Sequence, residues 1–181
     1  MTENSAASTK LSRPNRRSIG HSLHYSKRKG MMGELIFVVK ATSMGFAVSK
    51  PYGDTEAYDL LIEENGRLLR IQVKSVFTTS RWGYSVSVQR HSRGHGRPVI
   101  QYSAQEIDFI AAYVVPHDAW YIVPVFEIVS RAHIRLYPEG AKRNDGALFE
   151  KYREAWDLLR LGRATSTEAG CEARSKIKKR K

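Results

Sequence analysis

The stretch Tyr58-Asp-Leu-Leu-Ile-Glu-Glu-Asn-Gly-Arg-Leu-Leu-Arg-Ile-Gln-Val-Lys74 decides the fold, because it holds a tight-turn signal between two strand-forming segments. Asn65-Gly66 favours a type I′ turn, in which both central residues need a positive φ. A two-residue loop pairs Glu64 with Arg67, and the register of the remaining pairs follows from that one. This register places Asp59 opposite Gln72, with Lys74 farther along the same face.

The two faces of this predicted hairpin have different characters. The core-forming face is apolar and carries Leu60, Ile62, Leu69, Ile71 and Val73. The other face brings the carboxylate of Asp59, the amide of Gln72 and the amine of Lys74 within cross-strand reach. On an ordinary amphipathic hairpin these would be solvent-exposed groups without a specific role. Aspartate is disfavoured in strands, however, and Gln72 and Lys74 interrupt an otherwise apolar strand, so we favour a functional site.

The polar face has the chemistry of a divalent-metal site. Mg²⁺, or Mn²⁺ in its place, prefers oxygen ligands, and Asp59 offers a carboxylate, Gln72 an amide oxygen and Val73 a main-chain carbonyl. Lys74 is positioned to hold or deprotonate an attacking water and to offset charge on a phosphate. Its pKa should be lowered by a neighbouring cation. The set predicts metal-dependent hydrolysis of a phosphodiester.

Short motifs in a fixed order then resemble a known family. They are Gly33-Glu34, Pro51-Tyr-Gly53, Tyr58-Asp-Leu60, Gln72-Val-Lys74, Asp108-Phe109 and Tyr121-Ile-Val-Pro124. Together, over about residues 27 to 160, they resemble the small PD-(D/E)XK endonuclease family that includes a cyanobacterial group I intron homing endonuclease. Archaeal Holliday junction resolvases are more distantly similar. The chain departs from the standard superfamily pattern at Gln72, where a second acid is usual.

The resemblance implies an α/β fold of the restriction-endonuclease type, with a mixed β-sheet of about five strands flanked by helices. It implies that Asp59, Gln72, Lys74 and Glu34 form the catalytic site, with Glu34 supporting the metal. From position alone, Glu34 could equally interact only with the N-terminus of its helix. The resemblance also implies a dimer or higher homo-oligomer, because cutting two strands calls for two sites. We expect Asp108, at the start of a strand, to support the fold and not to be a ligand.

The charge of the chain is concentrated at its two ends. The net charge is +12. Residues 1–30 carry seven Lys/Arg and one acid, and residues 171–181 carry six Lys/Arg and one acid, so the segment between them is almost neutral. Basic arms of this kind commonly bind nucleic acid through its phosphates. The alternative is that they are solubilising tails without a specific partner.

A second basic region lies between residues 81 and 97. It has four arginines, two histidines and no acid. We expect Arg81, Trp82, Arg90, Arg93 and Arg97 to contact DNA, since an arginine-rich, glycine-containing loop suits backbone or groove contact. The alternative is an exposed flexible loop. The histidines lack the further Cys or His that a zinc site requires.

The remaining elements follow from periodicity. We expect a helix over residues 31–43, a strand at 46–49, and a strand at 84–88 pairing antiparallel with the second strand of the hairpin. Buried strands are expected at 108–115 and 119–125, a short strand at 133–136 and a capping-box turn at 103–106. Leu148, Tyr152, Trp156 and Leu159 predict an amphipathic helix over 147–161, with Tyr152 and Trp156 in the core. The domain plan is a disordered basic arm at 1–26, a nuclease-like domain at 27–162 and a disordered basic tail at 163–181.

The function these patterns predict is a metal-dependent endonuclease acting on DNA. One alternative is a DNA-binding protein on a nuclease scaffold that no longer cuts; another, weaker, is a ribosome- or RNA-associated basic protein. No apolar run approaches the ~20 residues of a membrane span, so no membrane association is expected. The single cysteine, Cys171, fits a reducing compartment. We therefore expect a bacterial cytoplasmic, nucleoid-associated location.

Overall fold

The centre of the computed structural model is a five-stranded mixed sheet in the order β1-β2-β3-β7-β8. The structure describes residues 16–53, 55–91, 98–141 and 147–161. The strands of this sheet are β1 (Ala47–Ser49), β2 (Leu60–Glu64), β3 (Arg67–Val76), β7 (Phe109–Val114) and β8 (Ala119–Pro124). Their number and the flanking helices confirm the predicted restriction-endonuclease-like α/β fold.

The β2–β3 hairpin has the predicted turn and register. Asn65 and Gly66 have φ values of 51° and 71°, the pair of positive values that a type I′ turn needs. Glu64 faces Arg67, and the antiparallel pairing continues to Leu60 opposite Ile71. The turn chemistry therefore fixed which residues of β3 face which layer of the protein.

The other edge of β3 makes the sheet mixed. β3 pairs in parallel with β7, from Ile71 opposite Phe109 to Val76 opposite Val114. β7 then pairs antiparallel with β8 across a short 3₁₀ turn, η1 (Val115–His117). All residues of β7 and β8 are buried, as their continuous apolar runs predicted.

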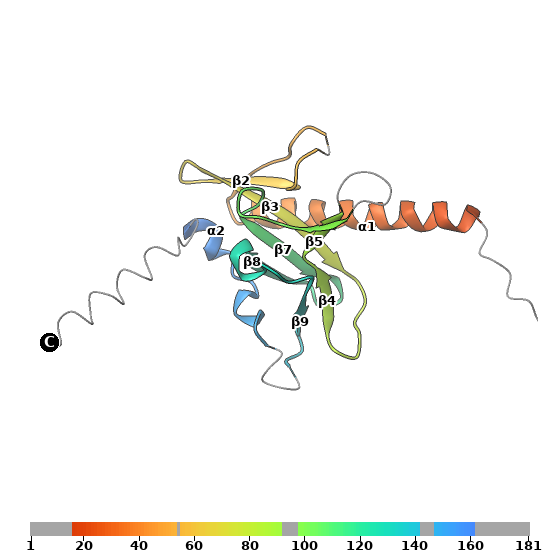
Figure 1. Ribbon diagram of the computed structural model, residues 1–181. Helices are drawn as coiled ribbons and strands as arrows, with labels where there is room; N and C mark the ends of the chain where they lie inside the picture. The colour runs from red at the N-terminus through yellow and green to blue at the C-terminus, as the bar shows by residue number, and fades with distance from the viewer. Residues whose placement is uncertain (1–15, 54, 92–97, 142–146, 162–181) are drawn as a thin grey trace, which may run out of the picture.

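A separate apolar layer covers each face of the sheet. On one face, β2, β3, β7 and β8 pack against Phe37 and Ala41 of α1 (Arg16–Ser43) and against Trp156 and Leu159 near α2 (Asp157–Leu161). On the other face lies a two-stranded ribbon of β4 (Tyr84–Ser87) and β9 (His133–Leu136), seen side by side in Figure 1. Its inward residues, such as Val86 and Ile134, pack on the sheet.

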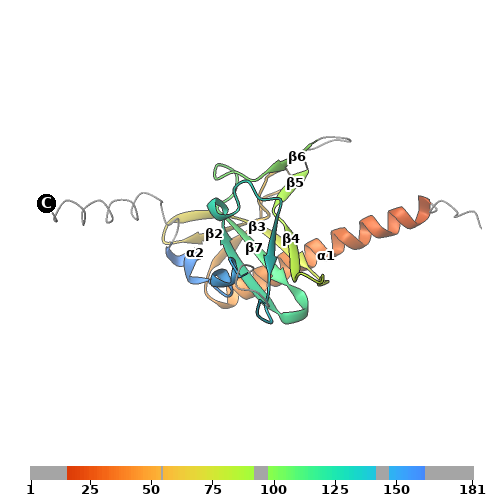
Figure 2. The ribbon, with the colours of Figure 1, turned by 60° about the horizontal axis from the view of Figure 1, so that its bottom comes forward.

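The prediction that residues 84–88 pair with the second hairpin strand is wrong. β4 pairs with β9, from Tyr84 opposite Leu136 to Ser87 opposite His133, whereas β3 pairs with β2 along the first part of one edge and with β7 along the other. A further ribbon, β5 (Gln89–His91) with β6 (Val99–Gln101), stands out from the body in Figure 2.

Helix α1 is longer than predicted. It begins at Arg16 rather than near Met31, so residues 16–26 of the expected disordered arm are helical. In both views the N-terminal part of α1 extends past the sheet (Figures 1 and 2). The sequence of that part carries no apolar periodicity that would reveal a helix.

The predicted helix over residues 147–161 is interrupted. The segment forms the 3₁₀ turn η4 (Glu150–Tyr152) and then the short α2. Between them Glu154 has a φ of 49° and donates its amide to the Trp120 carbonyl at 2.7 Å, which ends the helical path. Tyr152 and Trp156 are buried as predicted, whereas Leu148 is 46% exposed.

Two smaller features complete the fold. The 3₁₀ turn η2 (Val125–Glu127) follows β8. The predicted capping box is present, since the Glu106 carboxylate accepts hydrogen bonds from the Ser103 amide and hydroxyl, both at 3.1 Å. No helix within the described residues is long and apolar enough to cross a membrane.

Candidate active site

Asp59 lies where β2 leaves the regular pairing with β3. Its amide donates to the Ile71 carbonyl at 2.9 Å, while its carboxylate turns towards β3. Asp59 Oδ2 accepts hydrogen bonds from the Val73 amide, at 2.8 Å, and from Gln72 Nε2. The side chain thus replaces the strand partner that Val73 would otherwise have, and it joins Asp59 to Gln72 as the register predicted.

This junction leaves one edge of β3 open. β2 pairs with β3 only as far as Ile71, whereas β7 continues along the other edge to Val76. Asp59 Oδ1 accepts no hydrogen bond from the described residues. Among these residues, Arg90 Nε is the one polar side-chain atom that is both buried and unpartnered. Asp59 Oδ1, which is also unpartnered, is therefore accessible. The open edge and the exposed oxygen form a place where an external ligand can meet the protein.

Lys74 lies on the same side of β3 as Gln72 and is half-buried. Its Nζ is 5.4 Å from the centre of the Tyr102 ring, which forms a wall beside it. Tyr102 itself is only 5% exposed and belongs to the core beneath the β4–β9 ribbon. The amine is therefore held in a restricted space and does not extend freely into water.

Glu34 reaches the cluster from α1, and Lys50, a residue that the sequence analysis did not identify, is bonded to it. Lys50 Nζ donates to Glu34 Oε2 at 2.6 Å. Helix α1 lies close to β3 at Gly33, where a Cβ atom would be 3.0 Å from Ser75 Cβ and Oγ. This contact explains the Gly33-Glu34 pair, because only glycine allows α1 to carry Glu34 so near β3. Lys50 directly precedes the Pro51-Tyr-Gly53 turn, which is the signal that could have identified it.

The electrostatics of the cluster are those of a partly desolvated acid beside cations. Burial raises the pKa of Asp59 to about 6; the Glu34 carboxylate adds to this, while the Val73 hydrogen bond, Lys74 and Lys50 oppose it. Burial lowers the pKa of Lys74 from its ordinary value, although Asp59 opposes that shift. The hydrogen bond to Glu34 raises the pKa of Lys50. Perturbed pairs of this kind gather at functional sites.

The geometry can now be set beside known proteins. The sequence model of the family described as PD-(D/E)XK endonuclease matches residues 24–159, a range that includes every residue of the cluster. The chain belongs to the PD-(D/E)XK endonuclease family. The Asp59, Gln72 and Lys74 cluster resembles that family's motif, with Gln72 where the usual pattern has an acid.

A solved structure agrees with this assignment to the PD-(D/E)XK family. The chain is similar to a structure entitled "The structure of a bacterial homing endonuclease: I-Ssp6803I", with 33% sequence identity and a TM-score of 0.67. The match covers 75% of this chain and 93% of that one. No curated protein sequence matches. The family and the similar structure support nuclease activity, and PD-(D/E)XK nucleases generally use divalent metal ions.

The donor set of this PD-(D/E)XK chain fits such an ion only in part. Asp59 presents an accessible carboxylate oxygen next to the open strand edge, as a hard divalent cation requires. Gln72 Nε2 points towards Asp59 and, at 3.3 Å, the Val73 carbonyl, so the amide oxygen is turned away. A half-turn of the amide would present that oxygen. Within the described residues, no three His, Cys, Asp or Glu side chains group as a metal site.

The residues expected to contact DNA are dispersed. Arg81 lies over the Trp82 ring at 4.4 Å, and Trp82 is 51% exposed. Arg90 forms an ion pair with Glu106, so its guanidinium is already engaged. Arg93 and Arg97 lie outside the described residues. Of the three that the structure describes, Arg81, Trp82 and Arg90, none forms a hydrogen bond or ion pair with the Asp59 cluster.

Asp108 has the fold-supporting position that its place at a strand start predicted. Its carboxylate accepts hydrogen bonds from the Arg70 amide, at 2.9 Å, and from the Arg70 guanidinium, at 3.0 Å. Arg70 also donates to the carbonyls of Ala104 and Gln105. This contact ties the start of β7 to β3 and thereby fixes the strand that carries Gln72.

Proposed function

We propose that the protein is a divalent-metal-dependent endonuclease that hydrolyses DNA phosphodiester bonds at the Asp59 cluster. The observation that carries the proposal is the meeting of Asp59, Gln72 and Lys74 at the open edge of β3. One hairpin supplies these three residues, and family membership gives this arrangement its chemical meaning. The DNA substrate is inferred from the family and from the basic ends of the chain.

Mg²⁺, or Mn²⁺, would be held by Asp59 and the Val73 carbonyl, with Gln72 as a ligand after its amide turns and Glu34 in a supporting position. A bound divalent ion supplies positive charge beside the phosphate and makes nearby water more acidic. Asp59 contributes most, since the Val73 amide fixes its carboxylate against the open edge of β3. A raised pKa, as at Asp59, is expected of a partly desolvated carboxyl that would bind a cation.

The two lysines have separate roles in this proposal. Lys74 orients the attacking water and donates hydrogen bonds to the phosphate, and its lowered pKa leaves more of the amine unprotonated and able to accept a proton. Lys50 balances the charge of Glu34 next to Asp59, so that two carboxylates can stand near each other before a cation arrives.

Contacts to the rest of the DNA would come from Arg81, Trp82, Arg90, Arg93 and Arg97 and from the basic ends. Assembly into a dimer or higher oligomer would supply a second site for the second strand. Exposed apolar side chains on one side of α1 are consistent with such assembly: Met31, Leu35 and Val39 are 53%, 59% and 70% exposed. They recur every four residues and so line one face of the helix.

The test is cleavage of supercoiled plasmid and of branched DNA with Mg²⁺ or Mn²⁺. We expect Asp59→Asn and Lys74→Met to cut at least about a hundredfold more slowly while binding DNA as before. Matched controls are Asp157→Asn and Lys40→Met, which remove exposed charges elsewhere and should leave cleavage unchanged. Equal rates in Asp59→Asn and wild type would overturn the assignment of the site.

One observation favours a DNA-binding protein that does not cut. The described part of the chain offers Gln72 where a second acid would strengthen metal binding, and no acidic or histidine triad replaces it. Calorimetric titration with Mn²⁺ separates the two functions. Mn²⁺ binding that Asp59→Asn removes supports the nuclease, and the absence of any binding supports the alternative.

A further inference from the structure

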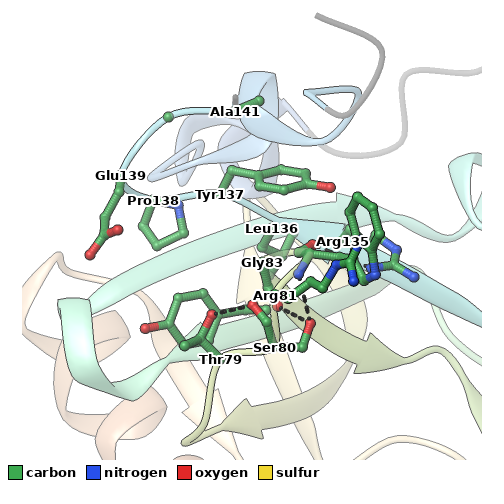
Figure 3. A pocket seen from close by; sticks show the side chains of 13 residues that line it. Thr79, Ser80, Arg81, Gly83, Arg135, Leu136, Tyr137, Pro138, Glu139 and Ala141 are labelled. Atoms are coloured by element: carbon green, nitrogen blue, oxygen red, sulfur yellow. Dashed lines mark hydrogen bonds between the residues drawn. The ribbon is translucent and has the colours of Figure 1, made fainter. Parts of the chain in front are cut away.

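A cavity away from the Asp59 cluster opens at the end of the β4–β9 ribbon. Its volume is about 800 Å³, within the range of about 300–1,000 Å³ that small-molecule sites occupy. Residues 79–84 form one side and residues 135–141 the other (Figure 3). In that view Tyr137 and Pro138 lie across the cavity from Thr79 and Ser80. None of these residues belongs to the Asp59 cluster, although Arg81 and Trp82 are among those proposed to contact DNA.

The wall formed by residues 80–83 is a tight turn held in one conformation. Ser80 and Gly83 exchange main-chain hydrogen bonds of 3.0 and 3.2 Å, and the Ser80 hydroxyl donates to the Gly83 carbonyl at 2.8 Å. Gly83 has a φ of 85°, and a Cβ atom there would be 2.7 Å from the Tyr137 ring. Glycine at this position therefore lets the turn press against the end of β9, so the cavity is formed before any ligand arrives.

The turn presents an aromatic ring and two cations. Trp82 is half exposed, with Arg81 over its ring and Arg135 Nη1 donating to its carbonyl at 3.3 Å. Within the described residues neither Arg81 nor Arg135 forms an ion pair, in contrast to Arg70, Arg90 and Arg160. A guanidinium stacked on a ring keeps its N–H groups pointing outward in its plane, where an anion can meet them. The site thus combines a stacking surface with unneutralised positive charge.

These properties indicate which class of ligand the pocket would bind. Nucleotides join a flat ring to a phosphate, and base stacking on an aromatic side chain is independent of base identity. A base inside a duplex is covered on both faces by its neighbours and cannot enter such a pocket unless it leaves the stack. The single carboxylate of the wall, Glu139, is 80% exposed at the rim and lies 3.5 Å from His117. It therefore leaves the interior of the pocket positively charged.

We propose that this pocket binds one unstacked nucleotide of the DNA substrate, with its base against Trp82 and its phosphate held by Arg81 and Arg135. The proposal rests on the proposed function in one respect, namely that the substrate is DNA. It makes DNA with an unpaired or extruded nucleotide the preferred substrate class. The pocket gives affinity and position, and the chemistry stays at the Asp59 cluster.

Tryptophan fluorescence can report on binding at this site. Of its three tryptophans, Trp120 and Trp156 are 1% and 3% exposed, so quenching from solution reports on Trp82. In EDTA, which prevents cutting, the full-length protein is titrated with a duplex and with the same duplex carrying one bulged nucleotide. We expect the bulged DNA to quench Trp82 emission and to bind roughly tenfold more tightly, the size of one base–aromatic contact.

Variants separate the pocket from general DNA affinity. Trp82→Leu and Arg135→Gln should abolish the preference for the bulge, while Trp82→Phe should keep most of it because a ring remains. Arg131→Gln removes an exposed charge elsewhere and should behave as wild type. Equal binding of both DNAs by wild type, or a preference that survives in Trp82→Leu, would overturn the proposal. Thermal unfolding of each variant verifies that it is folded.

The same titration with Asp59→Asn keeps the two proposals apart. If the preference for the bulge persists there, it supports the pocket whatever the cleavage assay shows. If the preference is absent in both wild type and Asp59→Asn, the pocket proposal fails even when cleavage depends on Asp59 as expected.

Discussion

At the residue scale, Asp59 has a structural role in β3 and a proposed role as a metal ligand, and a single substitution can remove both. Its Oδ2 completes the hydrogen bonding of β3 through the Val73 amide, while its Oδ1 faces outward. Truncation to alanine would remove the proposed ligand and also leave the Val73 amide without its partner. Asparagine retains a carbonyl oxygen for that amide and removes only the charge, which makes it the more informative replacement.

The pKa of Asp59 predicts how its charge affects stability. The folded protein holds this carboxyl at a pKa of about 6, above its unfolded value near 3.8, so the folded state binds the extra proton between these values. The stabilisation by this group is complete below about pH 4 and is lost as the pH rises through 6. In EDTA, the free energy of unfolding of wild type should therefore fall, relative to that of Asp59→Asn, by at most about 3 kcal/mol as the pH rises from 4 to 7.

Urea unfolding at several pH values measures this difference. Asp157→Asn serves as the control for the loss of an aspartate at an exposed position. A constant difference for Asp59→Asn would mean that the carboxyl titrates near its ordinary value.

The sequence predicted the centre of the site better than its rim. Asp59, Gln72 and Lys74 follow from one turn, since a two-residue loop determines which side chains face one another. Lys50 was missed because its partner Glu34 is on a helix, and no local pattern relates a helix face to a loop. Arg90 was expected to be free for DNA, yet its partner Glu106 comes from a turn whose position the sequence did not fix.

At the element scale, the seating of α1 on the sheet depends on Gly33. A Cβ atom there would meet Ser75 at 3.0 Å, whereas one at Gly30, a single turn earlier, would meet nothing within 4 Å. The two glycines thus provide a matched pair in one helix, one at the contact and one in open space.

Alanine at each position tests this contact. Gly30→Ala should stabilise the protein by about 0.5–1 kcal/mol, because alanine favours the helix and meets no obstacle. Gly33→Ala has the same propensity gain but must push α1 away from β3, so we expect a net loss of about 1 kcal/mol or more. Denaturant unfolding measures both, and equal stabilisation by the two substitutions would contradict the close packing of α1.

The elements that the sequence predicted well are those with local causes. The hairpin, the apolar strands β7 and β8, and the Ser103–Glu106 capping box each follow from adjacent residues. The errors have tertiary causes. β4 pairs with β9, a strand about fifty residues later that no local pattern relates to it. The C-terminal helix breaks where Arg153 forms a bridge with Tyr121 of β8.

At the scale of the whole molecule, the charge is divided between a nearly neutral centre and basic ends. Residues 171–181 carry six Lys/Arg and one acid. Contacts between such a segment and DNA release counterions, so they appear in the salt dependence of binding more than in specificity.

Replacing those six Lys and Arg residues by Gln should flatten the dependence of DNA affinity on salt. The slope of log K against log [salt] should fall by up to about 5, at about 0.9 per phosphate contact. Binding should weaken to a similar extent for all DNA sequences. Fluorescence anisotropy between 50 and 300 mM salt measures the slope, and an unchanged slope would show that this segment does not touch the DNA.

The unbroken course of α1 from Arg16 to Ser43 has a consequence for distances along a substrate. At 1.5 Å per residue, the first turn of the helix lies about 27 Å from Glu34 along the axis, close to the rise of eight base pairs of duplex. Because α1 is anchored beside Glu34, its far end keeps a set spacing and a set rotational phase relative to Asp59. A one-residue insertion near Gly30 would rotate that end by about 100° while moving it only about 1.5 Å. An insertion of this kind therefore changes the rotational phase of the helix end far more than its distance from Asp59.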